Sequence, residues 1–486
     1  MIERKSFHRQ ATIILKDEIT CQIVGLLPID VEVLFEQYGI FVPNFRHMQK
    51  YQLGIWDGKS HFFTKNATTY IYLLGEIIPF LKQNKYKITI DDRRINAPYE
   101  PKVITREHFS HIISAKTGEP YIMRDYQHES VNAVTQHGNG VIVAATSAGK
   151  TIINAALVDA YHDLRSITIV PITSLVTQTY KQFVELGLDA GRLVSGFEET
   201  NAQHLISTWQ SLQNRPHLMR ERQVLVVDEC HGASANTIKQ LTHDYGGNIA
   251  YRFGLTGSFP KEESYALSIN VSLGPIRYEI AADTLISAGW LAKPHITIYQ
   301  LDDIKHLSSY DNDDEKALIT YESETSFLQT CKERIQWVAD LIDACSVEEK
   351  GNTLCLVNSV TFGKKLAKLV PNAIFVYGKN EEEDRQRIYG LFEHNDGLRI
   401  IATRKVAGVG VSIDRIFKVI TVDLGKSFVA TIQALGRGLR KGRDKDSVKI
   451  YDVCSNLIHS TRHMKKRIRY YKEAKYPYKL KLVNYD

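Results

Sequence analysis

The residues best suited to chemistry form one short segment, Ala145-Thr146-Ser147-Ala148-Gly149-Lys150-Thr151, directly after the apolar run 140–144. Its small residues let backbone N–H groups approach a triphosphate, Lys150 can neutralise the β- and γ-phosphate oxygens, and Thr151 can hold Mg²⁺. The strict phosphate-loop pattern has a glycine where this chain has Ala144. The segment predicts an ATP site, and an ordinary turn of small residues is the alternative.

Two adjacent acids, Asp228 and Glu229, follow the apolar run 224–227. Such a run is typical of a buried parallel strand, whose carboxyl end lies at the edge of the sheet where ligands bind. Asp228 is then placed to hold Mg²⁺ through water, and Glu229 to orient and deprotonate the water that attacks the γ-phosphate. The alternative is an acidic pair that only ends a strand.

A third group lies near the C-terminal end, where Arg437 and Arg440 are three residues apart in the segment 433–440. On a helix both side chains project from one face. They can reach a γ-phosphate as arginine fingers and stabilise the charge of the transition state. A basic helix surface is the alternative interpretation.

The elements that must position these groups follow from two series of buried strands. The first series is expected at 141–144, 167–170, 205–207, 224–227 and 251–255, and the second at 353–357, 373–376, 400–402, 419–423 and 448–451. Helical patterns separate the strands, which is typical of doubly wound parallel sheets. The sequence therefore predicts an α/β protein with two such sheets, of which only the first carries a phosphate loop.

Composition shifts predict five segments. A small α+β nucleic-acid-binding module is expected at 1–112, the ATP-binding sheet domain at 113–296, an acidic connector at 297–330, the second sheet domain at 331–455, and a basic, tyrosine-rich segment at 456–486.

The last of these segments has an unusual charge. Nine basic and two acidic residues give 456–486 a net charge of +7, against +6 for the whole chain. Tyr470, Tyr471, Tyr476 and Tyr478 are interleaved with them. Cations and rings in this arrangement favour contact with nucleic acid, through residues such as Lys465 and Arg469. A solvated terminal helix whose tyrosines dock on the body of the protein is the alternative.

Composition also limits the class of protein. With 486 residues and 43% hydrophobic content the chain can form several globular cores. We expect a soluble cytoplasmic protein without membrane contact, in the host cytoplasm if it is phage-encoded, because no apolar stretch of about 18 residues and no secretion signal is present. The six scattered cysteines favour buried thiols over a zinc site or disulfides.

With the motifs in this order, the chain resembles superfamily 2 DExH-box helicases over nearly all residues after about 120. Arg124-Asp125-Tyr126-Gln127 is similar to the adenine-reading Q motif, and Asp228-Glu229-Cys230-His231 to the DExH box. The resemblance implies two tandem RecA-like domains, with Gln127 on the adenine, Tyr126 or Arg124 supporting it, and Gln433 at the nucleotide.

The resemblance also implies residues outside the catalytic centre. His231, Thr256 and Ser258 would couple nucleotide state to domain closure. Residues in motifs that grip a nucleic-acid strand would be Pro171, Thr173, Thr208, Gln210, Asn358, Thr403 and Gly408.

Within the superfamily, the likeness is strongest to UvsW-type phage helicases. It rests on 146–150, 208–210, 228–231, 253–258 and, outside the motor, on Gly54-Ile55-Trp56-Asp57-Gly58-Lys59. It implies an ATP- and Mg²⁺-dependent DNA motor that acts on Holliday junctions, stalled forks and displaced strands, in recombination, repair and replication.

Three other functions stay open at this point: a translocase on duplex DNA without net unwinding, an RNA helicase, and a nucleic-acid-binding scaffold without hydrolysis. The sequence names no strand-separating wedge and no protein partner. Trp56, Phe62 and Phe63 of the N-terminal module could stack on a displaced base, but we expect these aromatic residues to be core. Lys50, Lys59 and Lys65 are better candidates for phosphate contacts.

Overall fold

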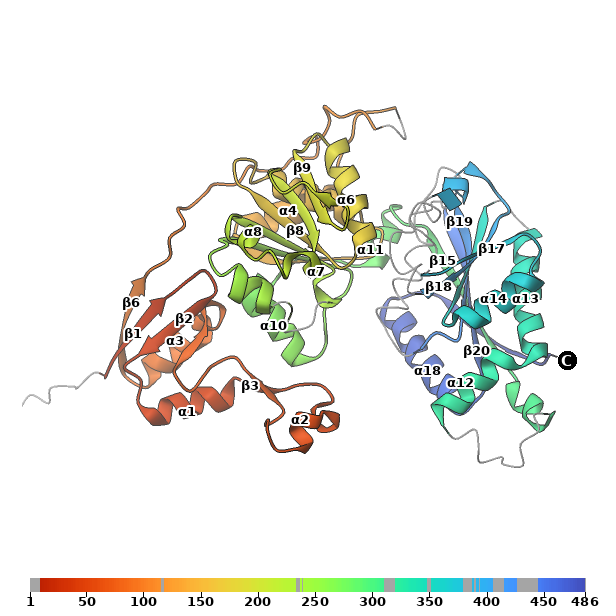
Figure 1. Ribbon diagram of the computed structural model, residues 1–486, viewed down its shortest axis with the longest axis horizontal. Helices are drawn as coiled ribbons and strands as arrows, with labels where there is room; N and C mark the ends of the chain where they lie inside the picture. Colours follow the sequence, from red (N-terminus) through yellow and green to blue (C-terminus); the bar gives the residue numbers. More distant parts are fainter. Residues whose placement is uncertain are drawn as a thin grey trace, which may run out of the picture. The chain divides into compact units, whose positions relative to one another are not determined.

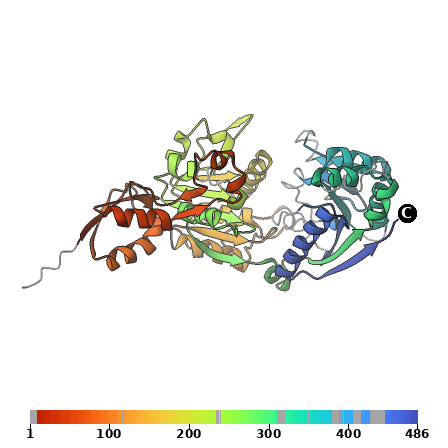
Figure 2. The ribbon, with the colours of Figure 1, turned by 90° about the horizontal axis from the view of Figure 1, so that it is seen from below.

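The computed structural model describes residues 9–114, 118–232, 237, 239–309, 320–347, 351–378, 387–388, 390–392, 394–404, 415–425 and 445–485. Two compact units divide the chain, one of residues 1–144 and 149–279 and the other of residues 145–148 and 280–486 (Figures 1 and 2). The first unit contains the N-terminal module and the first lobe, and the second contains the second lobe.

The N-terminal module is a four-stranded sheet with the order β5-β2-β1-β6. Its strands are β1 (Arg9–Leu15), β2 (Thr20–Val24), β5 (Thr68–Tyr70) and β6 (Tyr86–Asp92), and its helices are α1 (Pro28–Gln37) and α3 (Leu74–Gln83). Alternate residues of β1, Ala11 and Ile13 among them, are buried together with Leu34 of α1 and Ile77 of α3. A separate hairpin, β3 (Gly39–Phe41) and β4 (Lys59–His61), encloses the short helices η1 (Phe45–His47) and α2 (Gln49–Gln52).

The module packs against the first lobe. Val271 of α10 (Glu263–Leu273) belongs to the module's hydrophobic core. The Glu18 N–H donates to the Gly247 carbonyl over 2.9 Å, and the Glu18 carbonyl accepts from the Arg252 guanidinium over 2.9 Å. Apolar packing and buried hydrogen bonds therefore join module and lobe.

The sheet of the first lobe has the order β10-β9-β11-β8-β12-β13-β7-β14. Strands β9, β11, β8, β12, β13 and β7 pair in parallel, whereas β10 pairs antiparallel with β9 at one edge. Their bounds are β7 (Asn139–Ala144), β8 (Ser166–Val170), β9 (Ala190–Val194), β10 (Phe197–Glu198), β11 (His204–Thr208), β12 (Val224–Asp228), β13 (Tyr251–Thr256) and β14 (Ile276–Ile280). The helices include α4 (Asp125–Thr135), α5 (Lys150–Asp159), α6 (Thr173–Glu185), α7 (Trp209–Leu212) and α8 (His217–Arg220).

The second lobe is a seven-stranded sheet with the order β17-β18-β16-β19-β20-β15-β21, and its pairs are parallel. The strands are β15 (Lys293–Leu301), β16 (Asn352–Val357), β17 (Ala373–Val376), β18 (Arg399–Thr403), β19 (Ile416–Val422), β20 (Ser447–Ser455) and β21 (Tyr478–Val483). The helices include α11 (Ala282–Ser287), α12 (Tyr321–Thr330), α13 (Lys332–Val347), α14 (Val360–Leu369) and α18 (Ile458–Glu473).

Helices cover both faces of this second sheet. Figure 1 shows α13 and α14 on one side and α18 on the other. Right-handed crossovers require this arrangement, because the chain moves across the sheet in one direction from β15 to β17 and in the opposite direction from β20 to β21. The predicted fold class, two RecA-like doubly wound parallel sheets after a small α+β domain, is confirmed.

The structure differs from the predicted boundaries in the second lobe. Strand β15 begins at Lys293 and crosses the expected boundary at residue 297, and α12 occupies the end of the expected acidic connector. Residues 458–483 form α18 and β21, so the expected tail is an integral part of the lobe. Residues 310–319, which are rich in acids, lie outside the described residues.

Within the described ranges, no helix is both long and apolar enough to cross a membrane. All six cysteines are buried and none forms a disulfide.

Candidate functional site

The phosphate loop connects β7, which ends at Ala144, to α5, which begins at Lys150. Ser147 and Gly149 have φ angles of 70° and 83°, so the backbone turns twice through the left-handed region. Turns of this kind direct successive N–H groups toward an anion. The φ of Gly149 favours glycine, and a Cβ atom there would lie 2.5 Å from Nε2 at the end of the Gln127 side chain, which would have to move.

Lys150 meets the acids at the carboxyl end of β12. Its Nζ atom lies 3.2 Å from Oε1 of Glu229, and the Glu229 N–H donates to Oδ1 of Asp228 over 2.9 Å. Glu229 has a φ of 49°, a strained conformation for a residue with a side chain. The strand therefore delivers both carboxylates to the phosphate loop, as predicted from the order of the residues.

The two carboxylates differ in their proton affinity. Burial and the neighbouring Glu229 charge raise the pKa of Asp228 above its usual range. Burial also opposes ionisation of Glu229, but the charge of Lys150 and its hydrogen bond lower the pKa of the Glu229 carboxyl overall. Glu229 is therefore ionised and can accept a proton.

Mg²⁺ fits this group of residues. Oε2 of Glu229 is buried without a hydrogen-bond partner, and Nδ1 of His231 lies 3.4 Å from it. The two adjacent carboxylates, with the Thr151 hydroxyl in the first turn of α5, offer the hard oxygen ligands that Mg²⁺ prefers, and a divalent cation would offset their charge. Thr151 and Asp228 remain the predicted ligands.

Hydrogen bonds connect His231, which lies beside Glu229, to Thr256 and Ser258. Nδ1 of His231 lies 2.6 Å from Oγ1 of Thr256, which donates to the Ser258 carbonyl over 2.6 Å. Because that hydroxyl proton points to Ser258, the His231 ring must donate from Nδ1. Burial lowers the pKa of His231, so the ring is neutral and holds this one tautomer. The predicted coupling residues are thus in direct contact.

The Q-motif residues form a compact cap at the start of α4. Oε1 of Gln127 accepts from the Arg124 N–H over 2.9 Å, and the Arg124 guanidinium donates to the Tyr126 hydroxyl over 2.8 Å. Gln127 and Tyr126 are buried, and Gln127 lies against Gly149. Gln127 therefore contacts the phosphate loop itself, and its contact with adenine stays a prediction.

The predicted strand contacts of the first lobe fall into two groups. Pro171, Thr173 and Gln210 are exposed at the carboxyl ends of β8 and β11, where α6 and α7 begin. Thr208 is buried and its hydroxyl accepts from the Ser211 N–H over 3.3 Å, which caps α7. The Thr208 side chain is thus occupied as a helix cap, and contact of this residue with a nucleic-acid strand stays a prediction.

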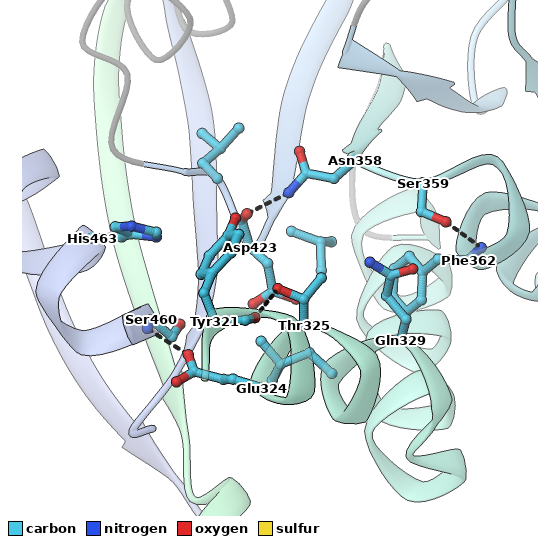
Figure 3. Close-up of a pocket in the computed structure, with 13 residues that line it drawn as sticks. Tyr321, Glu324, Thr325, Gln329, Asn358, Ser359, Phe362, Asp423, Ser460 and His463 are labelled. Atoms are coloured by element: carbon cyan, nitrogen blue, oxygen red, sulfur yellow. Dashed lines mark hydrogen bonds between the residues drawn. The ribbon is translucent and has the colours of Figure 1, made fainter. Parts of the chain in front are cut away.

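In the second lobe, Asn358 lies at a pocket at the carboxyl ends of β16 and β19 (Figure 3). Its Nδ2 atom donates to the Asp423 carbonyl over 2.6 Å, and its side chain is exposed. Glu324 of α12 reaches the first turn of α18 and accepts from the N–H groups of His459 and Ser460 over 2.8 and 2.6 Å. Thr403 is buried at the end of β18, and its contact with a nucleic-acid strand likewise stays a prediction.

Helix α18 separates two kinds of basic residue. Lys465 and Arg469 are exposed on one face, as predicted for nucleic-acid contact. Arg467 is buried on the other face, where it donates to both carboxylate oxygens of Asp452 over 2.8 and 2.9 Å, and the Tyr471 hydroxyl donates to the same carboxylate. Part of the predicted basic surface is therefore core.

Four predicted site residues lie outside the described residues: Gly408, Gln433, Arg437 and Arg440. One functional contact was not predicted from the sequence, namely the cap that Glu324 gives α18. No local pattern signals it, because the two elements are far apart along the chain.

Two family models match this chain, one in each lobe. The family model described as "Type III restriction enzyme, res subunit" matches residues 120–261, and "Helicase conserved C-terminal domain" matches residues 333–442. The chain belongs to the superfamily 2 helicases. It is thus an ATP-dependent enzyme of the helicase class, in agreement with the predicted activity.

Two curated relatives and one solved structure are similar to this helicase over most of its length. It is 24% identical over 481 residues to "ATP-dependent DNA helicase uvsW" of Enterobacteria phage T4, covering 91% of this chain and 93% of the relative. It is 24% identical to "DNA 3'-5' helicase XPB" of Kineococcus radiotolerans, covering 74% of this chain but only 64% of that relative. The Type ISP restriction-modification enzyme LlaBIII bound to DNA shares the fold at a TM-score of 0.56 and 12% identity, covering 85% of this chain and 36% of LlaBIII.

Proposed function

We propose that this helicase uses ATP hydrolysis to remodel branched DNA, namely Holliday junctions, stalled forks and displaced strands, in recombination, repair and replication. The observation that carries the ATPase part is the contact of Lys150, Glu229, His231 and Thr256 in one site of the first lobe. The likeness to a phage DNA helicase over 91% of the chain supports DNA as the substrate.

In the proposed reaction, Lys150 leaves Glu229 and pairs with the β- and γ-phosphate oxygens. Glu229 then orients a water and takes its proton while the water oxygen bonds to the γ-phosphorus. The bond between the γ-phosphorus and the bridging oxygen breaks, which gives ADP and phosphate. Mg²⁺, when bound, neutralises charge on the phosphate oxygens. Arg437 and Arg440 remain the proposed arginine fingers.

The contacts from Glu229 through His231 and Thr256 to Ser258 allow the first lobe to respond to the charge and pairing of Glu229. When Glu229 gains a proton or loses Lys150, its attraction for the His231 ring changes, and with it the Thr256–Ser258 contact. We propose that this contact couples hydrolysis to movement along DNA.

The proposed strand contacts are the exposed residues Pro171, Thr173, Gln210 and Asn358, with phosphate contacts from Lys465 and Arg469. Thr208 and Thr403 would act by positioning backbone N–H groups. Gly408 remains a proposed contact from the sequence.

The experiment that tests this proposal is the steady-state ATPase rate without nucleic acid and with single-stranded DNA, linear duplex, a four-way junction and RNA, at one salt concentration, with Lys150→Ala as the control. We expect the strongest stimulation by the junction. Strongest stimulation by RNA would contradict the DNA substrate, and stimulation by duplex without strand separation would identify a translocase. A wild-type rate equal to that of Lys150→Ala would identify a scaffold.

A further inference from the structure

The hairpin β3–β4 and the segment between its strands, residues 39–61, form a small body of their own in the N-terminal module, which we call the 39–61 projection. Figure 1 shows β3 and α2 apart from the four-stranded sheet. The two strands pair only with each other, at Gly39 with His61 through Phe41 with Lys59.

The projection has a rigid interior despite its size. The Phe41 and Phe45 rings stack at 4.6 Å, and Phe45 meets the Tyr51 ring edge-on at 4.7 Å. Gly58, with a φ of 83°, lies under Phe45, where a Cβ atom would come within 2.4 Å of the ring. The Trp56 indole donates to the Lys59 carbonyl over 2.8 Å. Stacked rings and a closed turn hold the shape of the tip.

The base of the projection is anchored to α1. Nζ of Lys59 lies 2.7 Å from Oε2 of Glu36, and the His61 ring stacks on Phe35 at 3.9 Å. The phosphate contact expected of Lys59 is therefore replaced by an anchoring role, because its charge is already paired.

The tip exposes apolar side chains. Leu53 is 63% exposed and Ile55 72%, and Met48 is also exposed. A rigid body that presents unpaired aliphatic side chains to water has a surface suited to another apolar surface. The flat face of a terminal base pair is one such surface, and proteins that open duplexes insert leucine, isoleucine or methionine at base steps.

The charge of the 39–61 projection favours DNA as the molecule that its apolar tip contacts. The sequence has no acid between Glu36 and Asp57, and within this span Arg46 and Lys50 are exposed. The Lys50 carbonyl accepts from the Ile55 N–H over 3.0 Å, so cation and apolar tip belong to the same turn. The exposed apolar residues of α1, Ile29 and Val33, lie instead beside the acids Glu32 and Glu36.

The projection is also connected to the ATP site. Helix α10 contacts both β3 and η3 (Cys230–Gly232), the short helix of the DExH box. The same helix begins five residues after Ser258. One rigid element therefore joins the residues that respond to hydrolysis and the base of the projection.

We propose that the 39–61 projection is the strand-separating pin of this helicase, with Leu53 and Ile55 against the base pair at the DNA junction and Arg46 and Lys50 on its phosphates. This inference rests on the proposed DNA helicase function and adds the element that separates the strands.

The test compares Leu53→Ser/Ile55→Ser with Ile29→Ser/Val33→Ser, a matched pair of exposed aliphatic residues in the same module. Single-turnover unwinding of a forked DNA should fall about tenfold in the first variant, because about 1.4 kcal/mol of base-pair opening is lost. Its ATPase rate on single-stranded DNA should stay within about twofold of wild type, and the second variant should match wild type in both assays.

A second readout does not depend on turnover. With 2-aminopurine at the junction base pair, binding of the wild-type protein should raise the fluorescence, and binding of Leu53→Ser/Ile55→Ser should not. If wild type unwinds the fork and this variant unwinds it equally fast, the pin is wrong and the patch serves another partner, such as a protein. If the wild-type protein unwinds no DNA, the proposed helicase function is wrong, and the proposed pin, which rests on it, is wrong as well. An equal loss of ATPase and unwinding would also overturn the pin.

Discussion

At the scale of single residues, Lys150 and Glu229 form an ion pair, with 3.2 Å between Nζ and Oε1. ATP must compete with this ion pair for the lysine. The carboxylate that is released is the same one that must accept a proton, so phosphate binding and activation of the base are linked.

Glu229→Gln removes the proton acceptor and keeps the shape of the side chain. We expect DNA-stimulated ATPase activity to fall by roughly 10²–10⁴-fold. Affinity for ATP should be kept or should rise, since Lys150 no longer has a charged competitor. Hydrolysis kinetics and binding of a fluorescent ATP analogue check both parts, and hydrolysis at the wild-type rate would refute the assignment.

Gly149→Ala should abolish nucleotide binding, because the new Cβ atom would meet Nε2 of Gln127 at 2.5 Å and the φ of 83° would be strained. Gly75→Ala is the matched control, since its Cβ atom would meet nothing within 4 Å. Titration with an ATP analogue measures the effect. Equal binding by both variants would show that the loop does not grip phosphate in this conformation.

At the scale of elements, most of the central strands could be predicted from the sequence, as could the edge strand β17, whereas the edge strand β21 could not. The central strands β12 and β16 contain the unbroken apolar runs 224–227 and 354–357, which mark them as buried on both faces. Strand β21 has the sequence YKLKLV with mostly exposed residues, which carries little apolar signal and resembles a basic tail. Only pairing with β15, which is far away along the chain, makes it a strand.

The candidate site, too, could be predicted from the sequence only in part. The phosphate loop and the DExH acids are contiguous in sequence, so their chemistry could be predicted. Whether a side chain is exposed depends on packing: Arg467 and Arg469 are two residues apart, yet one is buried against Asp452 and the other is in solvent.

The exposed face of α18 supports a prediction about salt. Replacing Lys465 and Arg469 by alanine should weaken DNA binding and lower the slope of log affinity against log salt by about one unit for each DNA phosphate that is no longer neutralised. Lys479→Ala/Lys481→Ala, on the exposed β21, is the control of equal charge. The same slope in both double variants would place the DNA elsewhere.

Point substitutions are needed, because truncation before Arg462 would also remove β21 and the buried Arg467–Asp452 pair.

At the scale of the whole molecule, a half-buried histidine, His243, lies where the N-terminal module meets the first lobe. The His243 ring is 4.9 Å from the Tyr70 ring, and its Nε2 atom has no hydrogen-bond partner. Burial, with Lys239 and Arg252 nearby, lowers the pKa of His243 to about 4 despite the opposing charge of Asp17. The packed state therefore requires a neutral ring.

The stability of this unit should depend on His243 in acid. Because the folded pKa lies below the unfolded value of about 6.5, the contribution is complete above that pH and is lost as the pH falls toward 4. His243→Phe should reduce the loss of unfolding free energy between about pH 7 and pH 5 by about 2 kcal/mol. Urea denaturation at both pH values measures this, with His217→Phe as the exposed control. An equal pH dependence in wild type and His243→Phe would contradict the prediction.

The position of β15 has a consequence for synthesis on the ribosome. This strand is the first of the second lobe to be made, yet its two neighbours, β20 and β21, are made after all the other described strands of that sheet. While residues 302–446 are translated, β15 has no partner on either edge. The N-terminal module and first lobe, by contrast, have every strand available once residue 280 has emerged. Translation thus produces a folded N-terminal module and first lobe tethered to an unpaired strand. The sheet of the second lobe can be completed only after residues 447–483 have left the ribosome.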